Sequence, residues 1–416
     1  MKVKSVFLQN NIQNPTKFDL LVKGQGVFIF SNKDNSVPCV IYFYNKDKTD
    51  GLQVNFTKNG VIVYKIAEHK HLTDKYNKKG LSNISGAYYW FSIDAQNQEL
   101  YAGIGEARLE TVIYQYAFNH DYKQFLESII SIHILEDSYS GDPLRVCPVS
   151  GDAGSSLRKN PIKPIQLLRD PITHKIPLLI KDIDELTMAD IAYATYMPKS
   201  NLSIISQKLY HCIAGKNFLL NTDEFADFSK AIEYSIATPG KWCHKKLKEK
   251  STEFNKDKPN IKETYLRITL GQNNGESPGI PYVMEIWPVG HFSPVHNHAG
   301  SSAVIRVLYG KINVKLFPFL SGETNKVEPF SEVQFSKDDV TWISPTLNQT
   351  HQLVNLDNNT ETCVTIQCYM YENENSLHYD YFDYADANGK IQQYEPDSDM
   401  DFISFREKIM EEWRNK

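Results

Sequence analysis

The sequence predicts a mainly β chain made of two β modules with a few flanking helices. Aromatic residues make up 12% of its 416 residues, and 24 of these are tyrosine, a residue enriched in strands. Short runs of β-branched and aromatic residues alternate with Gly, Asn and Pro, which is the usual pattern of strands and turns. A length of 416 residues suits two or three domains.

The first module, residues 1–144, contains several strand-like runs. Leu52–Thr57 and Val61–Tyr64 flank Asn59-Gly60, a strong hairpin signal that favours a type I′ turn. The other runs are Val27–Phe30, Val40–Tyr44, Tyr88–Ile93 and Thr111–Tyr116. We expect an antiparallel β-sandwich or barrel, whose role is open and could be binding of a protein or a sugar.

Residues 145–200 are predicted to be a linker or arm, and residues 201–416 a second domain. Small residues and spaced prolines mark the segment from Cys147 to Pro177. Helical signals then follow: a capping box at Thr187, an apolar period across 202–213, and acidic residues after Thr222 that favour a helix start. A strand pattern runs over 265–371, and one amphipathic helix is expected after Asp401.

Charge and composition exclude several classes of protein. Lys and Arg number 45 against 50 Asp and Glu, which argues against nucleic-acid binding. No apolar run approaches the ~20 residues needed to cross a bilayer, so no membrane partner is expected. The six cysteines form no CxxC pair, and we expect free thiols in a cytoplasmic protein.

Three histidines carry the strongest chemical signal. His296 and His298 are spaced by two, so in a strand both imidazoles project from one face and can reach one metal ion. His351 precedes a further strand-like run and supplies a third imidazole. Imidazole suits iron, copper, nickel and zinc, so the ligands alone do not choose the metal.

The spacing of Gly290, His296, His298 and Gly310 resembles the first motif of the cupin β-barrels, and His351 with Asn355 resembles the second. The resemblance implies a jelly-roll, or double-stranded β-helix, in residues 201–416. Cupins usually add a glutamate ligand after the histidine pair. Ser302 and Ala303 occupy those positions here.

Within the cupins, this lack of a carboxylate resembles the thiol dioxygenases, above all the cysteine dioxygenase family, over about residues 205–400. Tyr265-Leu-Arg267 matches that family's Tyr-x-Arg, and Trp287 its tryptophan before the metal strand. Thr365-Ile-Gln367-Cys-Tyr369 matches its Ser-x-His-x-Tyr strand.

The resemblance implies an oxidoreductase that uses Fe(II), held by the three histidines, to add O₂ to the sulfur of L-cysteine, giving cysteine sulfinate. Arg267 and Tyr265 would bind substrate, and Tyr369 would lie near the carboxylate and the oxygen. Thr365, Gln367 and Trp287 would support them. Cysteamine or 3-mercaptopropionate as substrate, another metal with a non-thiol substrate, and a non-catalytic binding cupin remain alternatives.

Purely structural roles remain open for Arg267 and Tyr369. Arg267 could form a surface salt bridge, and Tyr369 could simply pack the barrel. The chain also departs from the family pattern at some positions. Some relatives link a cysteine at the Ala303 position to the tyrosine; this chain cannot, and Cys368 should face the other side of the strand. Asn348 replaces a usual glycine but tolerates left-handed backbone angles.

Overall fold

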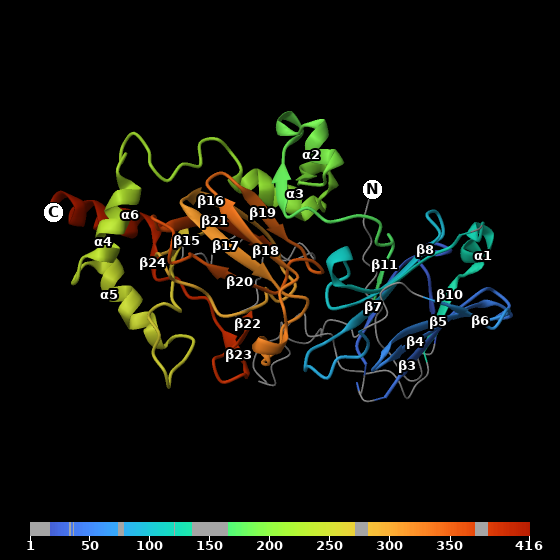
Figure 1. Ribbon diagram of the computed structural model, residues 1–416. Coiled ribbons are helices and arrows are strands. Elements are labelled where there is room, and N and C mark those ends of the chain that lie inside the picture. The colour runs from blue at the N-terminus through green and yellow to red at the C-terminus, as the bar shows by residue number, and fades with distance from the viewer. Residues whose placement is uncertain are drawn as a thin grey trace. The chain divides into compact units, whose positions relative to one another are not determined.

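The computed structural model describes residues 17–32, 35, 37–73, 79–119, 121–134, 165–270, 282–370 and 382–416. Two compact units divide the chain: Met1–Ile176 with Asn325–Val327, and Pro177–Thr324 with Glu328–Lys416. Strands make up most of the regular structure of both, as Figure 1 shows.

The N-terminal unit consists of two antiparallel sheets. One sheet has the strand order β1 (Lys17–Asp19), β10 (Ser131–Ile134), β3 (Cys39–Tyr44), β4 (Gly51–Thr57), β5 (Gly60–Lys65) and β6 (Lys70–Leu72). The other has the order β11 (Ile165–Leu168), β2 (Gln25–Phe30), β7 (Tyr89–Asp94), β8 (Glu99–Ile104) and β9 (Val112–Ala117).

Aromatic side chains join the two sheets face to face. Phe43 of β3 contacts Phe28 of β2 and Phe91 of β7, with ring centroids 6.3 and 5.0 Å apart. Phe56 of β4 meets Phe30 at 5.1 Å. Burial alternates along β3, which is typical of a strand with one face in the core. The predicted sandwich is therefore present.

The hairpin between β4 and β5 forms where predicted, but its turn is not type I′. Thr57 pairs with Gly60, so Lys58 and Asn59 are the two turn residues, and neither has the positive φ that type I′ requires. The Thr57 carbonyl accepts a hydrogen bond from the Leu81 amide instead, at 2.8 Å. This tertiary contact overrides the local preference of Asn-Gly.

The C-terminal unit contains a large sheet, a smaller sheet of three strands and a separate pair of strands. The large sheet has the order β13 (Tyr196–Pro198), β12 (Leu179–Lys181), β19 (Val340–Ile343), β16 (Ser302–Tyr309), β21 (Cys363–Met370), β15 (Tyr282–Trp287), β14 (Leu266–Leu270) and β24 (Met400–Asp401). The smaller strands are β18 (Ser331–Ser336), β17 (Lys311–Leu316), β20 (His351–Val354), β22 (Phe382–Ala385) and β23 (Ile391–Tyr394).

Side chains from both sheets share one core. Trp287 and Val307 of the large sheet pack with Ile312, Val314 and Phe335 of the smaller one. His296 bridges both His351 and Tyr384, and so joins β20 to β22. This topology confirms the predicted fold class, a mainly β chain with a sandwich and a cupin-type jelly-roll barrel with flanking helices.

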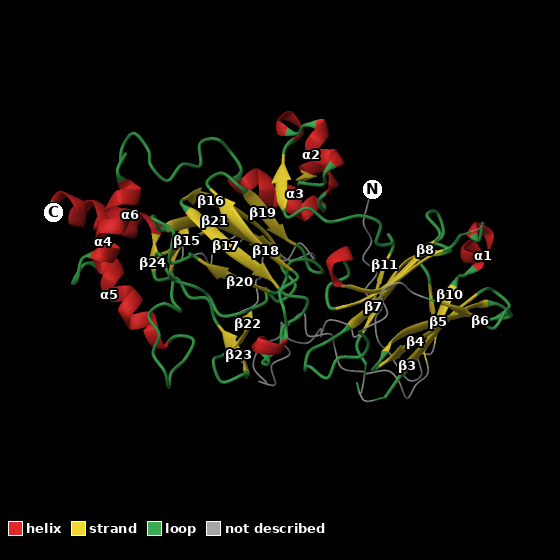
Figure 2. Ribbon diagram, viewed as in Figure 1, coloured by secondary structure: helices red, strands yellow, loops and turns green. Residues whose placement is uncertain are grey.

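Helices cover the outside of the barrel, as Figure 2 shows. They are α2 (Met188–Ala192), α3 (Ile204–Ile213), α4 (Phe228–Ala237), α5 (Trp242–Glu249) and α6 (Phe402–Arg414), while α1 (Lys123–Ser128) belongs to the N-terminal unit. Short 3₁₀ turns lie at η1 (Leu109–Thr111), η4 (Ile183–Glu185), η5 (Lys199–Asn201), η6 (Lys250–Thr252) and η8 (Thr324–Lys326). Arg306 holds the end of α3 by donating to the carbonyls of Ile213 and Gly215, at 3.2 and 2.8 Å.

Two predicted helix starts are confirmed and one is wrong. Thr187 and Asp190 form the reciprocal capping box of α2, and Asp401 caps α6 by accepting from the Ser404 amide. The helix expected near Thr222 begins only at Phe228, because the Asn221 side chain accepts a hydrogen bond from the Ser229 amide across the intervening loop, at 2.8 Å.

The segment expected as a linker, 145–200, is described only from residue 165. Its first part, including Cys147–Ser156, lies outside the described residues. The described part contains β11, paired with β2, and then β12, α2 and β13. None of the helices that the structure describes is long and apolar enough to span a membrane.

Gly310, in the turn between β16 and β17, is expected to tolerate no side chain. Its φ is +69°, and an added Cβ would lie 2.4 Å from the Thr362 carbonyl oxygen. We expect Gly310→Ala to lower the free energy of unfolding by about 2–4 kcal/mol, by strain and overlap together. Gly240 is the control, because its φ is +91° but an added Cβ meets nothing within 4 Å. If urea denaturation shows that Gly310→Ala and Gly240→Ala lower the free energy of unfolding equally, the overlap with the Thr362 carbonyl has no effect.

Candidate metal centre

Three histidine side chains converge at one end of the barrel interior. One ligand nitrogen from each of His296, His298 and His351 lies within 4.8 Å of the others. The amide of His296 donates to the carbonyl of His351 at 3.0 Å, and the reverse bond measures 2.9 Å. His298 follows in a loop rather than in the expected strand, and it precedes a turn in which Ala299 has φ +53°. The predicted histidine cluster therefore forms.

Hydrogen bonds orient two of the imidazoles. His296 Nδ1 lies 3.0 Å from the Pro294 carbonyl, and His351 Nδ1 lies 3.2 Å from the Asn348 carbonyl. Because a carbonyl oxygen only accepts, each Nδ1 carries the proton and each Nε2 keeps a free lone pair. Asn348 has φ +61°, so asparagine does adopt the left-handed turn for which glycine is usual.

Burial keeps all three imidazoles neutral. It lowers the pKa of His296 to about 4 and the pKa of His351 to about 3, and it lowers the pKa of His298 well below its ordinary value. The neighbouring histidines lower the pKa of His298 further. Neutral imidazole is the form that binds metal ions, so the cluster is ready for one near neutral pH.

The spacing of the nitrogens fits a divalent ion. His298 Nε2 and His351 Nε2 are 3.1 Å apart. Two nitrogens bound about 2.1 Å from one ion, at a right angle, would be separated by about 3.0 Å. Among the described residues, none offers a hydrogen bond to the buried Nδ1 of His298. The three residues fit a metal ion bound through imidazole nitrogen alone.

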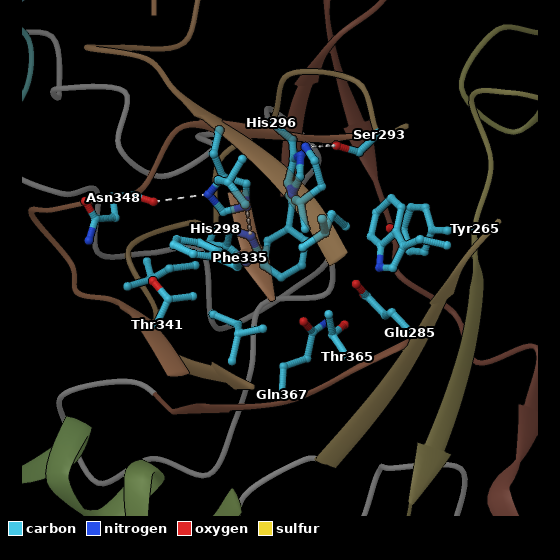
Figure 3. A pocket seen from close by; sticks show the side chains of 18 of the residues that line it. Tyr265, Glu285, Ser293, His296, His298, Phe335, Thr341, Asn348, Thr365 and Gln367 are labelled. Carbon is cyan, nitrogen blue, oxygen red and sulfur yellow. Dashed lines mark hydrogen bonds between the residues drawn. The ribbon is translucent and has the colours of Figure 1, made fainter. Parts of the chain in front are cut away.

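The cluster borders a small cavity between the two sheets. Its volume is about 70 Å³, where one water needs roughly 10–15 Å³. Most of the wall is apolar and includes Ile305, Val307, Ile312, Val314, Leu316 and Phe335. Figure 3 shows the polar ends of Glu285, Thr365 and Gln367 turned toward the space that His296 and His298 border. The cavity suits a small ligand with one polar end.

The strand register brings the polar residues of the large sheet together. Arg267 of β14 is the direct partner of Glu285 on β15, and Glu285 is the partner of Thr365 on β21. Direct partners lie roughly 4.5–5.5 Å apart at Cβ, so these side chains form one row facing the cavity. Thr365, Gln367 and Tyr369 share one face of β21 and all line the cavity, as the spacing by two predicts.

Arg267 lies in the cavity wall and forms a buried salt bridge. Its Nη1 is 3.1 Å from Glu285 Oε1, and the two residues are only 8% and 5% exposed. Glu285 was not among the residues that the sequence singled out. The available signal was a carboxylate inside the otherwise apolar run Tyr282–Trp287.

The two charges of this pair stabilise each other. Burial raises the pKa of Glu285, and Arg267 and a hydrogen bond from Gln367 oppose that rise. Burial on its own lowers the pKa of Arg267, but Glu285 and Tyr369 outweigh it, so the net pKa of Arg267 is raised. Burial also raises the pKa of Tyr369, whose hydroxyl accepts a hydrogen bond from Arg267.

The aromatic residues predicted near the site lie in its wall. Tyr265 stacks on Trp287 with ring centroids 4.2 Å apart, and both line the cavity. Tyr369 stacks on His298 at 5.6 Å and pairs across the sheet with Ala303. Cys368 points away from the cavity, with its Sγ 3.4 Å from the Leu209 carbonyl of α3, so no thioether partner for Tyr369 comes from it.

Acidification is expected to destabilise the metal-free protein. An unfolded histidine has a pKa near 6.5, whereas His296 and His351 titrate at about 4 and about 3 when folded. Between these values the unfolded chain binds more protons, so stability present above pH 6.5 is lost as the pH falls, by up to ~1.4 kcal/mol per pH unit for each histidine. Thermal denaturation from about pH 7.5 to about pH 4.5 measures this slope. His351→Asn should reduce it; an unchanged slope would contradict the assignment.

No protein-family model and no curated protein matches the chain. Similar solved structures include the Schizosaccharomyces pombe Cnp3 cupin domain, at 16% identity over 26% of this chain and 66% of that chain, with a TM-score of 0.21.

Two enzymes are also among the similar solved structures. Acinetobacter sp. DL28 L-ribose isomerase matches at 16% identity over 22% of this chain and 48% of that chain, with a TM-score of 0.20. The DMSP lyase DddQ from Ruegeria pomeroyi matches at 13% identity, 26% and 47% coverage and a TM-score of 0.20. The chain spans less than two thirds of the Cnp3 domain and of both enzymes.

Proposed function

We propose that the C-terminal unit is an Fe(II)-dependent thiol dioxygenase whose substrate is L-cysteine. The observation that carries the proposal is a neutral three-histidine cluster, to which the described part of the chain adds no carboxylate ligand, at a small cavity that contains a buried arginine. Three neutral ligands leave the charge of a divalent ion uncompensated, and a substrate thiolate would supply the missing anion. The sequence resemblance to the cysteine dioxygenase family points to iron.

Different side chains of the cavity would bind the metal ion and the substrate. A ferrous ion on His296, His298 and His351 would supply the redox chemistry. Arg267 would bind the substrate carboxylate, since a guanidinium and a carboxylate match as a planar fork. The Tyr369 hydroxyl, which touches Arg267, would orient the same carboxylate. The apolar wall excludes water, which strengthens both contacts.

The overall reaction balances without a further reductant. Both atoms of one O₂ form bonds to the substrate sulfur, and the thiol becomes a sulfinic acid. The sulfur loses four electrons and the two oxygen atoms gain them. The reaction therefore needs only the thiol, O₂ and the bound metal.

Oxygen consumption by the full chain tests the proposal. Metal-free protein is loaded with Fe(II) without oxygen and then given L-cysteine, cysteamine or 3-mercaptopropionate in aerated buffer. We expect oxygen uptake with L-cysteine above the other two, and a sulfinate that carries both atoms of ¹⁸O₂. Iron retained at one per chain with no thiol-dependent uptake would instead indicate a non-catalytic binding cupin.

A second candidate substrate is a thiol that carries an amine but no carboxylate, such as cysteamine. The observation that favours it is Glu285, which already occupies one side of Arg267 at 3.1 Å. The three-substrate comparison separates the two candidates.

A further inference from the structure

The buried pair of Arg267 and Glu285 needs an explanation beyond the metal centre. Transferring two charges into the interior costs several kcal/mol per ion, and apolar residues of similar size often stabilise a fold as well or better. Glu285 is the acidic residue of a strand whose other residues are Tyr, Val, Met, Ile and Trp. Packing of the barrel does not require a carboxylate at position 285.

Unused hydrogen-bonding groups surround the pair. Trp287 Nε1 and Thr365 Oγ1 are buried, line the same cavity and have no hydrogen-bond partner among the described residues. Both residues are 1% exposed. Buried polar groups without a partner are rare, and each needs an explanation, such as a bound water or ion. The wall of the cavity therefore contains two opposite charges and two polar residues whose hydrogen-bonding groups have no partner among the described residues.

We propose that Glu285 and Arg267 together form a zwitterion-selective subsite, in which Arg267 binds the carboxylate and Glu285 the ammonium group of an α-amino acid thiol. This assignment rests on the proposed function and adds Glu285 as a second residue that selects its substrate. An α-amino acid carries both charges on one carbon, so they can lie antiparallel to the charges of Arg267 Nη1 and Glu285 Oε1. The substrate then adds to the ion pair without breaking it.

The same pair rejects ligands with a single charge. Glu285 repels the carboxylate of 3-mercaptopropionate, and Arg267 repels the ammonium of cysteamine. Both repulsions act inside an apolar cavity, where charges interact more strongly than in water. Glu285 is thus a specificity-determining residue.

Oxygen analogues of the three thiols test the subsite without metal or turnover. L-serine, ethanolamine and 3-hydroxypropionate are titrated into the metal-free full chain, and binding is followed by saturation-transfer NMR. Losing one hydrogen-bonded charge lowers affinity by about tenfold or more, so L-serine should bind at least ~10-fold more tightly than either analogue. Glu285→Gln should remove the preference over 3-hydroxypropionate, and Arg267→Gln the preference over ethanolamine.

Two further variants control for folding. Glu285→Asp keeps the charge and should restore part of the selectivity. Glu412→Gln removes another buried carboxylate, which lies on α6 and accepts from Ser235 of α4 and from the Trp242 amide of α5, and this variant should leave the order of ligands unchanged.

Failure of the subsite and failure of the proposed function are distinguishable. If L-serine binds no better than ethanolamine or 3-hydroxypropionate, the subsite is wrong whatever thiols the iron-loaded protein oxidises. If L-serine is preferred and the preference depends on Glu285, the subsite stands even where L-cysteine gives no oxygen uptake. Preference for ethanolamine would also overturn it and favour a cationic substrate.

Discussion

Replacing His298 by alanine is expected to weaken the binding of a divalent metal ion by at least ~100-fold. Losing an outer hydrogen-bond partner of a ligand already costs 10–100-fold in affinity, and here a ligand itself is removed. Two imidazoles, His296 and His351, would remain, and no carboxylate among the described residues belongs to the cluster. Anaerobic titration with Fe(II) or Co(II), followed by measurement of bound metal, gives the affinity, and oxygen uptake should be lost with it.

His291 provides the matched control for this variant. It lies in the same loop region as His296, but its Nδ1 is 2.9 Å from the Thr264 carbonyl and it is not part of the cluster. His291→Ala should bind metal like the unmodified chain. Equal metal binding by His298→Ala and the unmodified chain would refute the three-histidine site. His298→Gln keeps the size of the side chain and separates loss of the ligand from loss of folding.

Replacing Arg267 by methionine is expected to lower the free energy of unfolding by about 3–5 kcal/mol, because Glu285 would stay buried without its cation. The double variant Arg267→Met/Glu285→Met removes both charges and should lie within ~1 kcal/mol of the unmodified chain, or above it. Urea denaturation of the two single variants and the double variant measures the coupling energy.

An exposed ion pair is the control for the effect of burial on the coupling between Arg267 and Glu285. Lys408 and Glu411 on α6 are 2.8 Å apart, with side chains 41% and 60% exposed. Such surface pairs contribute little to stability, so Lys408→Met should lower the free energy of unfolding far less than Arg267→Met does. If the losses of the two single variants at Arg267 and Glu285 simply add in the double variant, the pair is not coupled and the proposed subsite loses its basis.

Local sequence patterns predicted the strands better than the turns and helix starts. In β3 and β4, buried residues alternate with partly exposed ones. This pattern repeats every two residues, so it can be recognised from the strand itself whatever the rest of the sandwich is. The turn after Thr57 and the start of α4 depend on Leu81 and Asn221, which act through contacts outside the turn and helix themselves. Preferences of short segments cannot include such contacts.

At the site, the three metal ligands could be predicted from the sequence. Of the buried pair, Arg267 was predicted and Glu285 was not. The spacing of His296 and His298, with His351 beyond, marked the cluster directly. Arg267 was found through a family pattern that contains no partner for it. Glu285 becomes its neighbour only through the pairing of β14 with β15, and one sequence does not state which strands pair or in which register.

The reciprocal backbone bonds between His296 and His351 have a consequence for how the centre is assembled. They join two segments that are distant along the chain through backbone groups that do not bind the metal, so we expect the two ligand rings to be held in place without an ion. Loading should then leave the backbone almost unmoved, unlike small zinc domains that fold only around their ion. Chelators should remove the ion and leave a barrel that can be refilled.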